Sequence, residues 1–295
     1  MNNFSTSSTL FSRNFSLHLG ERIVDLSKPL VMGIINATPD SFFQGSRLPQ
    51  PSEAMEVAGR MLDAGAVILD VGAVSTRPGA GEIPEEEELS RLSPVVEAIR
   101  TRYPECAISV DTWRSGVALT MHRRFSINMV NDISAGLLDP LMFSTMADLK
   151  IPYVMMHMQG KPEDMQKEPE YKNVTDDLLQ FFGERIFRLR KLGIHDIVID
   201  PGFGFGKTLE QNYQLLRELG AFSMLELPVM VGVSRKSMIY KTLDTDPGNA
   251  MNGTTAAHMA ALLGGASILR VHDVKEAVET VKIFQQIMNR PSHSV

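Results

Sequence analysis

Short hydrophobic runs, mostly rich in β-branched residues, recur along the chain with polar or helix-like sequence between them. Eight runs predict strands at residues 30–35, 67–71, 107–110, 129–132, 153–157, 197–200, 229–233 and 268–271. Their hydrophobic character is continuous rather than alternating, which is typical of strands buried on both faces. The pattern therefore predicts a parallel sheet that is covered by helices.

The segments between these runs carry helix signals. Residues 54–62 place apolar side chains at helical spacing and Gly65 follows, while residues 174–192 form a long amphipathic pattern that ends at Gly193. Three helix starts are marked by Pro84 before four glutamates, by Thr208 with Gln211, and by Asp273 with Glu276. Strands and helices thus alternate along the chain.

Eight β-α units without a break in composition predict an α/β fold, a single-domain (β/α)8 TIM barrel. We expect the barrel to occupy residues 15–290, between a flexible N-terminus at 1–14 and a tail at 291–295. A doubly wound open sheet is the alternative. Residues 15–27 predict a small hairpin that covers the barrel bottom, the end at which the strands begin.

Polar residues stand where each predicted strand stops. They are Asn36, Asp70, Asp111, Asn131, His157, Asp200, Ser234 and, around the last strand, Arg270 with His272. One polar residue after a strand is usually a helix cap or a turn residue. A barrel gathers all eight strand ends at one mouth, and burying so many polar groups without a ligand is costly. The sequence therefore predicts a ligand site at the mouth.

The stretch DPGFGFGKT at 200–208 superficially suggests a phosphate-binding loop. A P-loop needs a glycine where Pro201 stands, and the dinucleotide fingerprint needs its third glycine where Lys207 stands. Both readings fail. We expect Asp200 to bind the ligand, the glycines to let Phe205 approach a flat ring, and Lys207 to do no more than begin the next helix.

The residue types at the mouth favour a flat heterocycle beside an anion. The carboxylates of Asp111 and Asp200 can each accept two N–H groups from a guanidine-like edge, Asn131 matches its donor–acceptor pattern, and Lys236 can reach a ring carbonyl. The methionine-rich run at 155–158 is expected to pack in the core, with one methionine touching the ring. Arg77, Arg270 and His272 suit a phosphate or pyrophosphate, and Asn36 can offer an oxygen ligand to Mg²⁺.

Composition narrows the class of protein. The chain has 295 residues with a net charge of −6, which argues against a general nucleic-acid-binding surface. No apolar run is long enough for a membrane helix, and the lone Cys106 excludes an internal disulfide and fits a reducing, cytoplasmic location. We expect small-molecule substrates rather than nucleic acid or membrane as partners.

Eight motifs, in register from the first strand to the last helix, resemble the dihydropteroate synthase family of bacterial folate synthesis. They are INATPDSF (35–42), DVGAVSTRPGA (70–80), SVDT (109–112), NDIS (131–134), MHMQG (156–160), DPGFGFGK (200–207), GVSRKSM (232–238) and RVHDV (270–274). The resemblance implies a homodimeric enzyme that condenses 6-hydroxymethyl-7,8-dihydropterin pyrophosphate with 4-aminobenzoate, with Mg²⁺ as cofactor.

The resemblance also assigns roles. The pterin-binding residues would be Asp111, Asn131, Met155, Asp200, Phe205 and Lys236. The pyrophosphate-binding residues would be Arg77, Arg270, His272 and Asn36, the last also as Mg²⁺ ligand. The residues around 4-aminobenzoate would be Thr76, Pro78, Phe42 and Ser237, with Asp40 and Asp70 in support.

Two positions depart from the family pattern. Gln44 stands where the family usually has a second acid in its first loop, and Ala73-Val74 replaces the commoner Gly-Glu or Gly-Gln before STRPG. Three rivals are open at this point: a methyltetrahydrofolate:corrinoid methyltransferase-like barrel, a non-catalytic pterin binder, and a phosphate-sugar barrel. The first two share the ring clamp but do not require the pyrophosphate-binding residues.

Overall fold

The fold is described from a computed structural model for residues 15–37, 51–74, 83–160 and 169–288. A two-stranded hairpin comes first, formed by β1 (Ser16–Leu19) and β2 (Arg22–Asp25). An eight-stranded parallel sheet follows, made of β3 (Leu30–Asn36), β4 (Ile68–Gly72), β5 (Ala107–Asp111), β6 (Met129–Asp132), β7 (Tyr153–Met156), β8 (Ile197–Asp200), β9 (Met230–Val231) and β10 (Ile268–Val271). Both sets agree with the sequence prediction of a hairpin and eight parallel strands.

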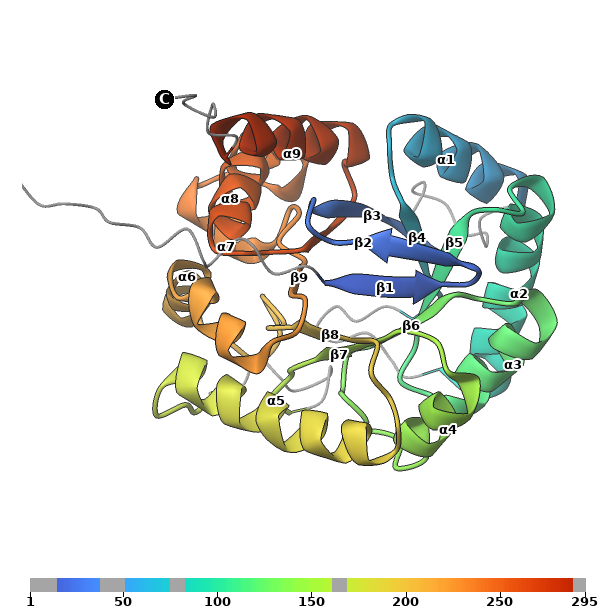
Figure 1. Ribbon diagram of the computed structural model, residues 1–295. Coiled ribbons are helices and arrows are strands. Elements are labelled where there is room, and N and C mark those ends of the chain that lie inside the picture. Colours follow the sequence, from blue (N-terminus) through green and yellow to red (C-terminus); the bar gives the residue numbers. More distant parts are fainter. Residues whose placement is uncertain (1–14, 38–50, 75–82, 161–168, 289–295) are drawn as a thin grey trace, which may run out of the picture.

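Helices follow the strands and surround them (Figure 1). They are α1 (Pro51–Asp63), α2 (Glu85–Arg102), α3 (Ser115–Phe125), α4 (Met142–Leu149), α5 (Val174–Lys191), α6 (Leu209–Arg217), α7 (Ser237–Thr242), α8 (Met251–Leu263) and α9 (Val274–Met288), with short 3₁₀ turns at Leu219–Leu225 and Pro247–Asn249. Thr208 and Gln211 form the predicted capping box at the start of α6. Asp273 precedes α9, but its carboxylate pairs with Arg235.

The sheet closes into a barrel. Its strand order is β8-β7-β6-β5-β4-β3-β10-β9, and β8 meets β9 through a single parallel bridge between Ile199 and Val229. The Ile199 amide donates to the Pro228 carbonyl at 3.0 Å across this seam. The barrel prediction is confirmed and the open-sheet alternative is wrong. The predicted strand at 229–233 is shortened to two residues at the seam.

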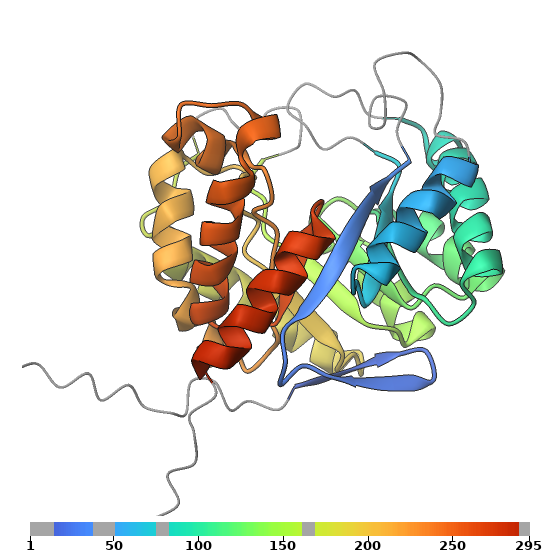
Figure 2. The ribbon, with the colours of Figure 1, turned by 90° about the horizontal axis from the view of Figure 1, so that it is seen from above.

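Side chains inside the barrel form levels. At the level nearest the strand starts, each of the eight strands contributes one buried apolar residue: Met32, Ile68, Ala107, Met129, Val154, Val198, Met230 and Ile268. Leu17, Leu19 and Leu26 of the hairpin segment pack against this level. Figure 2 shows the hairpin lying across that end of the barrel, so its predicted role as a bottom cover is confirmed.

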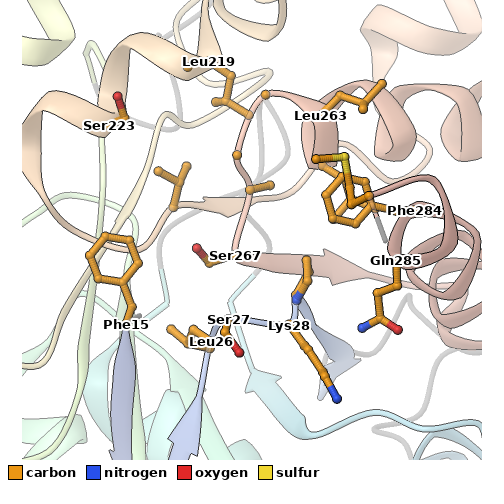
Figure 3. A pocket seen from close by; sticks show the side chains of 18 of the residues that line it. Phe15, Leu26, Ser27, Lys28, Leu219, Ser223, Leu263, Ser267, Phe284 and Gln285 are labelled. Atoms are coloured by element: carbon orange, nitrogen blue, oxygen red, sulfur yellow. The ribbon is translucent and has the colours of Figure 1, made fainter. Parts of the chain in front are cut away.

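A pocket of about 430 Å³ also lies at the bottom end (Figure 3). Its lining includes Phe15, Leu26, Lys28, Leu263 and Phe284, from the hairpin segment and from α8 and α9. These residues lie beside the strand starts, so the pocket is at the opposite end from the mouth. Among the described helices, none is both long and apolar enough to cross a membrane.

Candidate functional site

We call the level of apolar side chains nearest the strand starts, from Met32 to Ile268, the apolar floor. One level above it, the interior of the barrel becomes polar. Successive side chains of a strand alternate between its two faces, so residues two positions beyond the floor also face inward. At this level stand Asp70, Ser109, Asn131, Asp200 and Arg270, together with Ile34, Met156 and Gly232. Asp111 and Lys236 lie beyond them toward the mouth. We call Asp70, Asp111, Asn131, Asp200, Lys236 and Arg270 the mouth cluster.

Asp70 is the centre of the hydrogen bonding in the mouth cluster. It is fully buried, and its Oδ2 accepts from Asn131 Nδ2 at 3.0 Å and from Arg270 Nε at 2.7 Å. Arg270 Nη2 donates in turn to Asp111 Oδ2 at 2.7 Å. One guanidinium thus joins two carboxylates from neighbouring strands. Asp70 Oδ1 has no hydrogen-bond partner among the residues that the structure describes.

Burial sets the charge states of this group. It raises the pKa of Asp111 to about 7, because Arg270 only partly offsets the loss of water and Asp70 adds like charge. Burial alone would lower the pKa of Arg270, but Asp70 and Asp111 outweigh it and the pKa is raised. The guanidinium therefore remains charged, whereas Asp111 can exchange a proton near neutral pH.

Asp200 begins the tight turn that follows β8. Its Oδ1 accepts from the Gly202 amide at 2.8 Å, which fixes the carboxylate against the turn. Gly202 has a φ of +71°, and a Cβ there would lie 2.0 Å from the His157 carbonyl oxygen, so only glycine fits. Burial raises the pKa of Asp200, and the charge of Lys236 opposes that rise.

Lys236 completes the cluster from the loop after β9. Its Nζ donates to the Phe203 carbonyl and lies 4.7 Å from the centre of the Phe205 ring. Burial lowers the pKa of Lys236 to about 8, against the opposing effect of Asp200. The structure therefore places the predicted Asp200, Phe205 and Lys236 together, on one side of the mouth.

Arg235 anchors the loop that carries Lys236, a role that the sequence analysis did not assign. Its guanidinium pairs with Asp273 at 2.7 and 3.0 Å and donates to the carbonyls of Pro247 and Gly248, both at 2.8 Å. Arg235 itself has a φ of +53°, a strained value for a side chain of its size. In the sequence, the only sign of this role was the position of Arg235 directly before Lys236 in the SRKS motif.

Three further predicted residues also lie at strand or helix ends near the mouth. Asn36 is the last residue of β3, half-buried, and aligned with Gly72 of β4. His272 follows β10 with an exposed side chain, and its amide donates to Ser234 Oγ at 3.3 Å. Ser237 is the first residue of α7, directly after Lys236. Their positions suit the predicted contacts, and their roles stay predictions.

Two predictions about β7 are wrong. Met155 is 0% exposed and packs in the core between barrel and helices, so it cannot touch a ligand in the mouth. Met156 has the inward register and packs with Trp113 and Phe205 instead. His157, expected at the mouth, lies behind the strand end, where its ring packs edge-on against Phe181 at 4.6 Å between centroids. The two-residue strand period predicts both corrections.

Lys207 also differs from its prediction. It is 3% exposed, and its Nζ lies within hydrogen-bonding distance of the carbonyls of His157, Gly202 and Phe205 at 3.2, 3.0 and 2.8 Å. Thr208, not Lys207, caps α6. The residue that was expected only to begin a helix is therefore at the centre of the DPGFGFGK loop.

Several predicted residues lie outside the described parts of the chain. They are Asp40, Phe42, Thr76, Arg77 and Pro78, together with Gln44 of the first departure from the family pattern. Of the second departure, Ala73 is fully buried, and its carbonyl accepts from Arg91 Nη1 at 3.3 Å. Val74 packs against the cluster of Trp113, Ile133, Met156 and Met158.

The side chains near the mouth indicate how a metal ion could be held there. Within the described ranges, no three histidine, cysteine or acidic side chains gather in a way that could hold an ion. Asn36 offers one amide oxygen. A single protein ligand fits Mg²⁺, which keeps several waters and commonly binds through substrate phosphates. The described residues therefore fit Mg²⁺ that arrives with a phosphorylated ligand.

Comparisons with known proteins agree with this geometry. The family model described as pterin binding enzyme matches residues 32–272. A dihydropteroate synthase of Escherichia coli is 44% identical over 268 residues, covering 90% of this chain and 94% of its own. Solved dihydropteroate synthases of Yersinia pestis, with a sulfonamide drug, and of Xanthomonas albilineans, with 4-aminobenzoic acid, each superpose with a TM-score of 0.87. Their identities are 42% and 38%, covering 92% and 94% of this chain and 99% and 100% of theirs.

Proposed function

The chain belongs to the family of pterin-binding enzymes, and we propose that it acts as a dihydropteroate synthase. It condenses 6-hydroxymethyl-7,8-dihydropterin pyrophosphate with 4-aminobenzoate and releases pyrophosphate and 7,8-dihydropteroate, a step of folate synthesis. The observation that carries this proposal is the mouth cluster, where buried carboxylates, an amide and two cations converge at the carboxyl ends of the strands. Active sites of this fold lie at that end.

The pterin edge supplies adjacent N–H donors, which match a carboxylate. Asp200 is held by Gly202 and lies among the buried groups of the mouth, so its carboxylate can accept two parallel N–H bonds from the ring. Asn131 on β6 and Asp111 on β5 continue the clamp across the barrel mouth, and Lys236 reaches a ring oxygen while Phe205 covers the ring face. A charged acceptor that is already oriented binds more strongly than one that must be ordered.

The pyrophosphate requires the cationic side of the mouth. Arg270 lies at its centre, with its orientation fixed by Asp70 and Asp111, and His272 follows on the same strand face because Val271 between them packs outward. Arg77 is the third proposed contact. When the C–O bond to pyrophosphate breaks, the leaving oxygen takes the electron pair, and these groups stabilise its charge.

The amine needs little activation. Loss of pyrophosphate leaves positive charge over the methylene and the ring, which Asp111 and Asp200 stabilise. The aromatic amine of 4-aminobenzoate then forms the new C–N bond and loses one proton, and no strong base is required. Thr76, Pro78, Phe42 and Ser237 are the proposed contacts of 4-aminobenzoate, with Asp40 and Asp70 in support.

Magnesium is proposed as the cofactor, with Asn36 as its protein ligand. When bound, Mg²⁺ supplies charge that makes pyrophosphate a better leaving group. The protein contributes an amide oxygen at the end of β3 and the neighbouring cationic side chains.

We place the reaction in the cytoplasm, which fits a buried, unpaired Cys106.

A homodimer is the proposed assembly. Exposed apolar side chains on the outer helices, Leu263 of α8 with Ile283 and Ile287 of α9, support it because such residues can form an interface. Analytical ultracentrifugation over a concentration series tests this point. A sedimentation coefficient of the monomer at all concentrations would contradict the dimer and leave the proposed reaction untouched.

The reaction is tested by incubating the protein with dihydropterin pyrophosphate, Mg²⁺ and 4-aminobenzoate. We expect pyrophosphate and dihydropteroate to form in equal amounts. Pterin binding without turnover would favour a non-catalytic binder. Methyl transfer to a corrinoid, with no pyrophosphate release, would favour the methyltransferase-like barrel.

A further inference from the structure

We propose that Lys207 is a positioning residue for the pterin site, because its buried ammonium fixes the loop that holds Asp200 and Phe205 in place. This proposal deepens the proposed function and rests on it. We assign Lys207 no contact with the reacting atoms. Burial lowers the pKa of Lys207 to about 7, and the charge of Asp200 in the mouth cluster opposes that change. The argument comes from what surrounds its ammonium.

The surroundings of Lys207 are backbone carbonyls rather than carboxylates. Its Nζ lies 3.2, 3.0 and 2.8 Å from the carbonyl oxygens of His157, Gly202 and Phe205, and 3.2 Å from His157 Nδ1. A lysine ammonium has three N–H donors, so at least one N–H is shared among these four acceptors. No ion pair of Lys207 occurs among the described residues. Burying an ammonium is costly unless hydrogen bonds compensate for the lost water, so these carbonyls must stay in place around it.

Those carbonyls belong to segments that must lie in register for ring binding. His157 follows β7, Gly202 forms the turn after β8, and Phe205 lies three residues further along the loop. The Gly202 amide holds the Asp200 carboxylate, and the Phe205 ring lies beside Lys236. Lys207 thus links the turn that holds Asp200, the backbone of the ring-covering Phe205 and the neighbouring strand end through direct hydrogen bonds.

His157 is fixed by the same contact. Lysine can only donate, so Nδ1 of His157 accepts and its ring proton lies on Nε2. Burial, followed by the charge of Lys207, lowers the pKa of His157 to about 2, so the ring stays neutral. The aromatic rings of Tyr171 and Phe181 pack around it. The histidine is therefore part of the support behind the loop.

Tyr171 provides a second hydrogen bond to the backbone of the same loop. The Tyr171 hydroxyl donates to the Gly206 carbonyl at 2.8 Å, next to Lys207 in sequence. Removing the Lys207 ammonium would leave the His157 and Phe205 carbonyls without this donor, whereas the Gly202 carbonyl keeps the Phe205 amide at 3.1 Å. Buried carbonyls without donors are rarely tolerated. The loop would then shift toward other donors or admit water. Asp200 and Phe205 would lose their fixed positions with it.

The test compares Lys207→Met with Lys207→Arg and with Lys275→Met. Lys275 is on α9 and largely exposed, so the same substitution there controls for loss of a lysine. We expect Lys207→Met to weaken pterin binding by about 10- to 100-fold in calorimetry, the range for losing hydrogen bonds to a charged group. The KM for 4-aminobenzoate should change by less than about twofold, since uniform binding to a separate subsite is untouched. Lys207→Arg, which keeps the charge and donors, should recover part of the pterin affinity.

A folded Lys207→Met with wild-type pterin affinity would overturn the proposal. So would a variant whose two KM values rise equally, or one that loses only stability. If Lys207→Met does not fold, Tyr171→Phe removes one hydroxyl that donates to the same loop and should weaken pterin binding by about three- to tenfold. Unchanged affinity in Tyr171→Phe would show that the loop position does not govern ring binding. A wild-type protein that binds free pterin but makes no dihydropteroate would contradict the proposed function alone.

Discussion

Replacing Asp111 by asparagine is expected to stabilise the protein while it weakens pterin binding. The pKa of this carboxyl is higher in the folded than in the unfolded protein, about 7 against 3.8. The folded state therefore holds its proton more tightly. The stability that this proton provides is complete below about pH 4 and is lost as the pH rises through about 7. An asparagine at this position stays neutral at every pH, so the variant does not lose this stability as the pH rises.

The size of the effect follows from that shift. About three pKa units at ~1.36 kcal/mol each give an upper limit of about 4 kcal/mol above neutral pH. The side chain is 17% exposed, and water that reaches it lowers this limit, so we expect about 2 kcal/mol. The competing effect is loss of the Arg270 contact. Arg270 keeps Asp70 as a partner at 2.7 Å, so its charge is not left unpaired.

Urea unfolding at about pH 5 and about pH 8 measures the difference in unfolding free energy between variant and wild type at each pH. The unfolding free energy of Asp111→Asn should exceed that of wild type by more at the higher pH, and calorimetry should show weaker pterin binding at both. Asp148→Asn, at an exposed position on α4, is the matched control. An Asp111→Asn variant that is less stable than wild type, most of all at about pH 8, would refute the reasoning.

Three further predictions test other parts of the molecule. Asp200→Asn should abolish pterin binding, because the bidentate charged acceptor is lost; unchanged affinity in calorimetry contradicts the assignment. Arg77→Ala should spare pterin binding but slow turnover by about a hundredfold, the usual cost of one preorganised charge, and a wild-type rate would remove Arg77 from the leaving-group contacts. Leu17→Ala should cost about 2–5 kcal/mol of unfolding free energy with both KM values unchanged, because this buried hairpin residue packs at the opposite end from the mouth. Altered KM values would show that the two ends are coupled.

The strands and their order in the chain could be read from the sequence because each is a local hydrophobic run. The predicted ends of most strands differ from the structure by one residue or less. Strand β9 is the exception: the run at 229–233 forms only Met230–Val231. That run lies at the seam, where pairing with β8 is a single bridge, and hydrophobicity alone does not report pairing.

The polar strand ends could be recognised for the same local reason, but their directions required the strand period. Every second residue of a strand faces the same side, so the positions two beyond the apolar floor, Met156 and Asp200, face inward. Met155 and His157, one position away, face outward. The prediction of Met155 as a ring contact ignored this alternation. The motif resemblance supplied the residue set, and it did not supply the side of the strand.

The sequence alone determined the β-α alternation, the hairpin, and the polar groups that collect at the strand ends, since these depend on neighbours within a few positions. Only the tertiary structure decided how those groups pair. Arg270 meets Asp70 and Asp111 from positions 200 and 159 residues away, and Lys207 turns inward under its own loop. Such pairings depend on closure of the barrel, which removes water and leaves each buried charge with the partners that the fold brings to it.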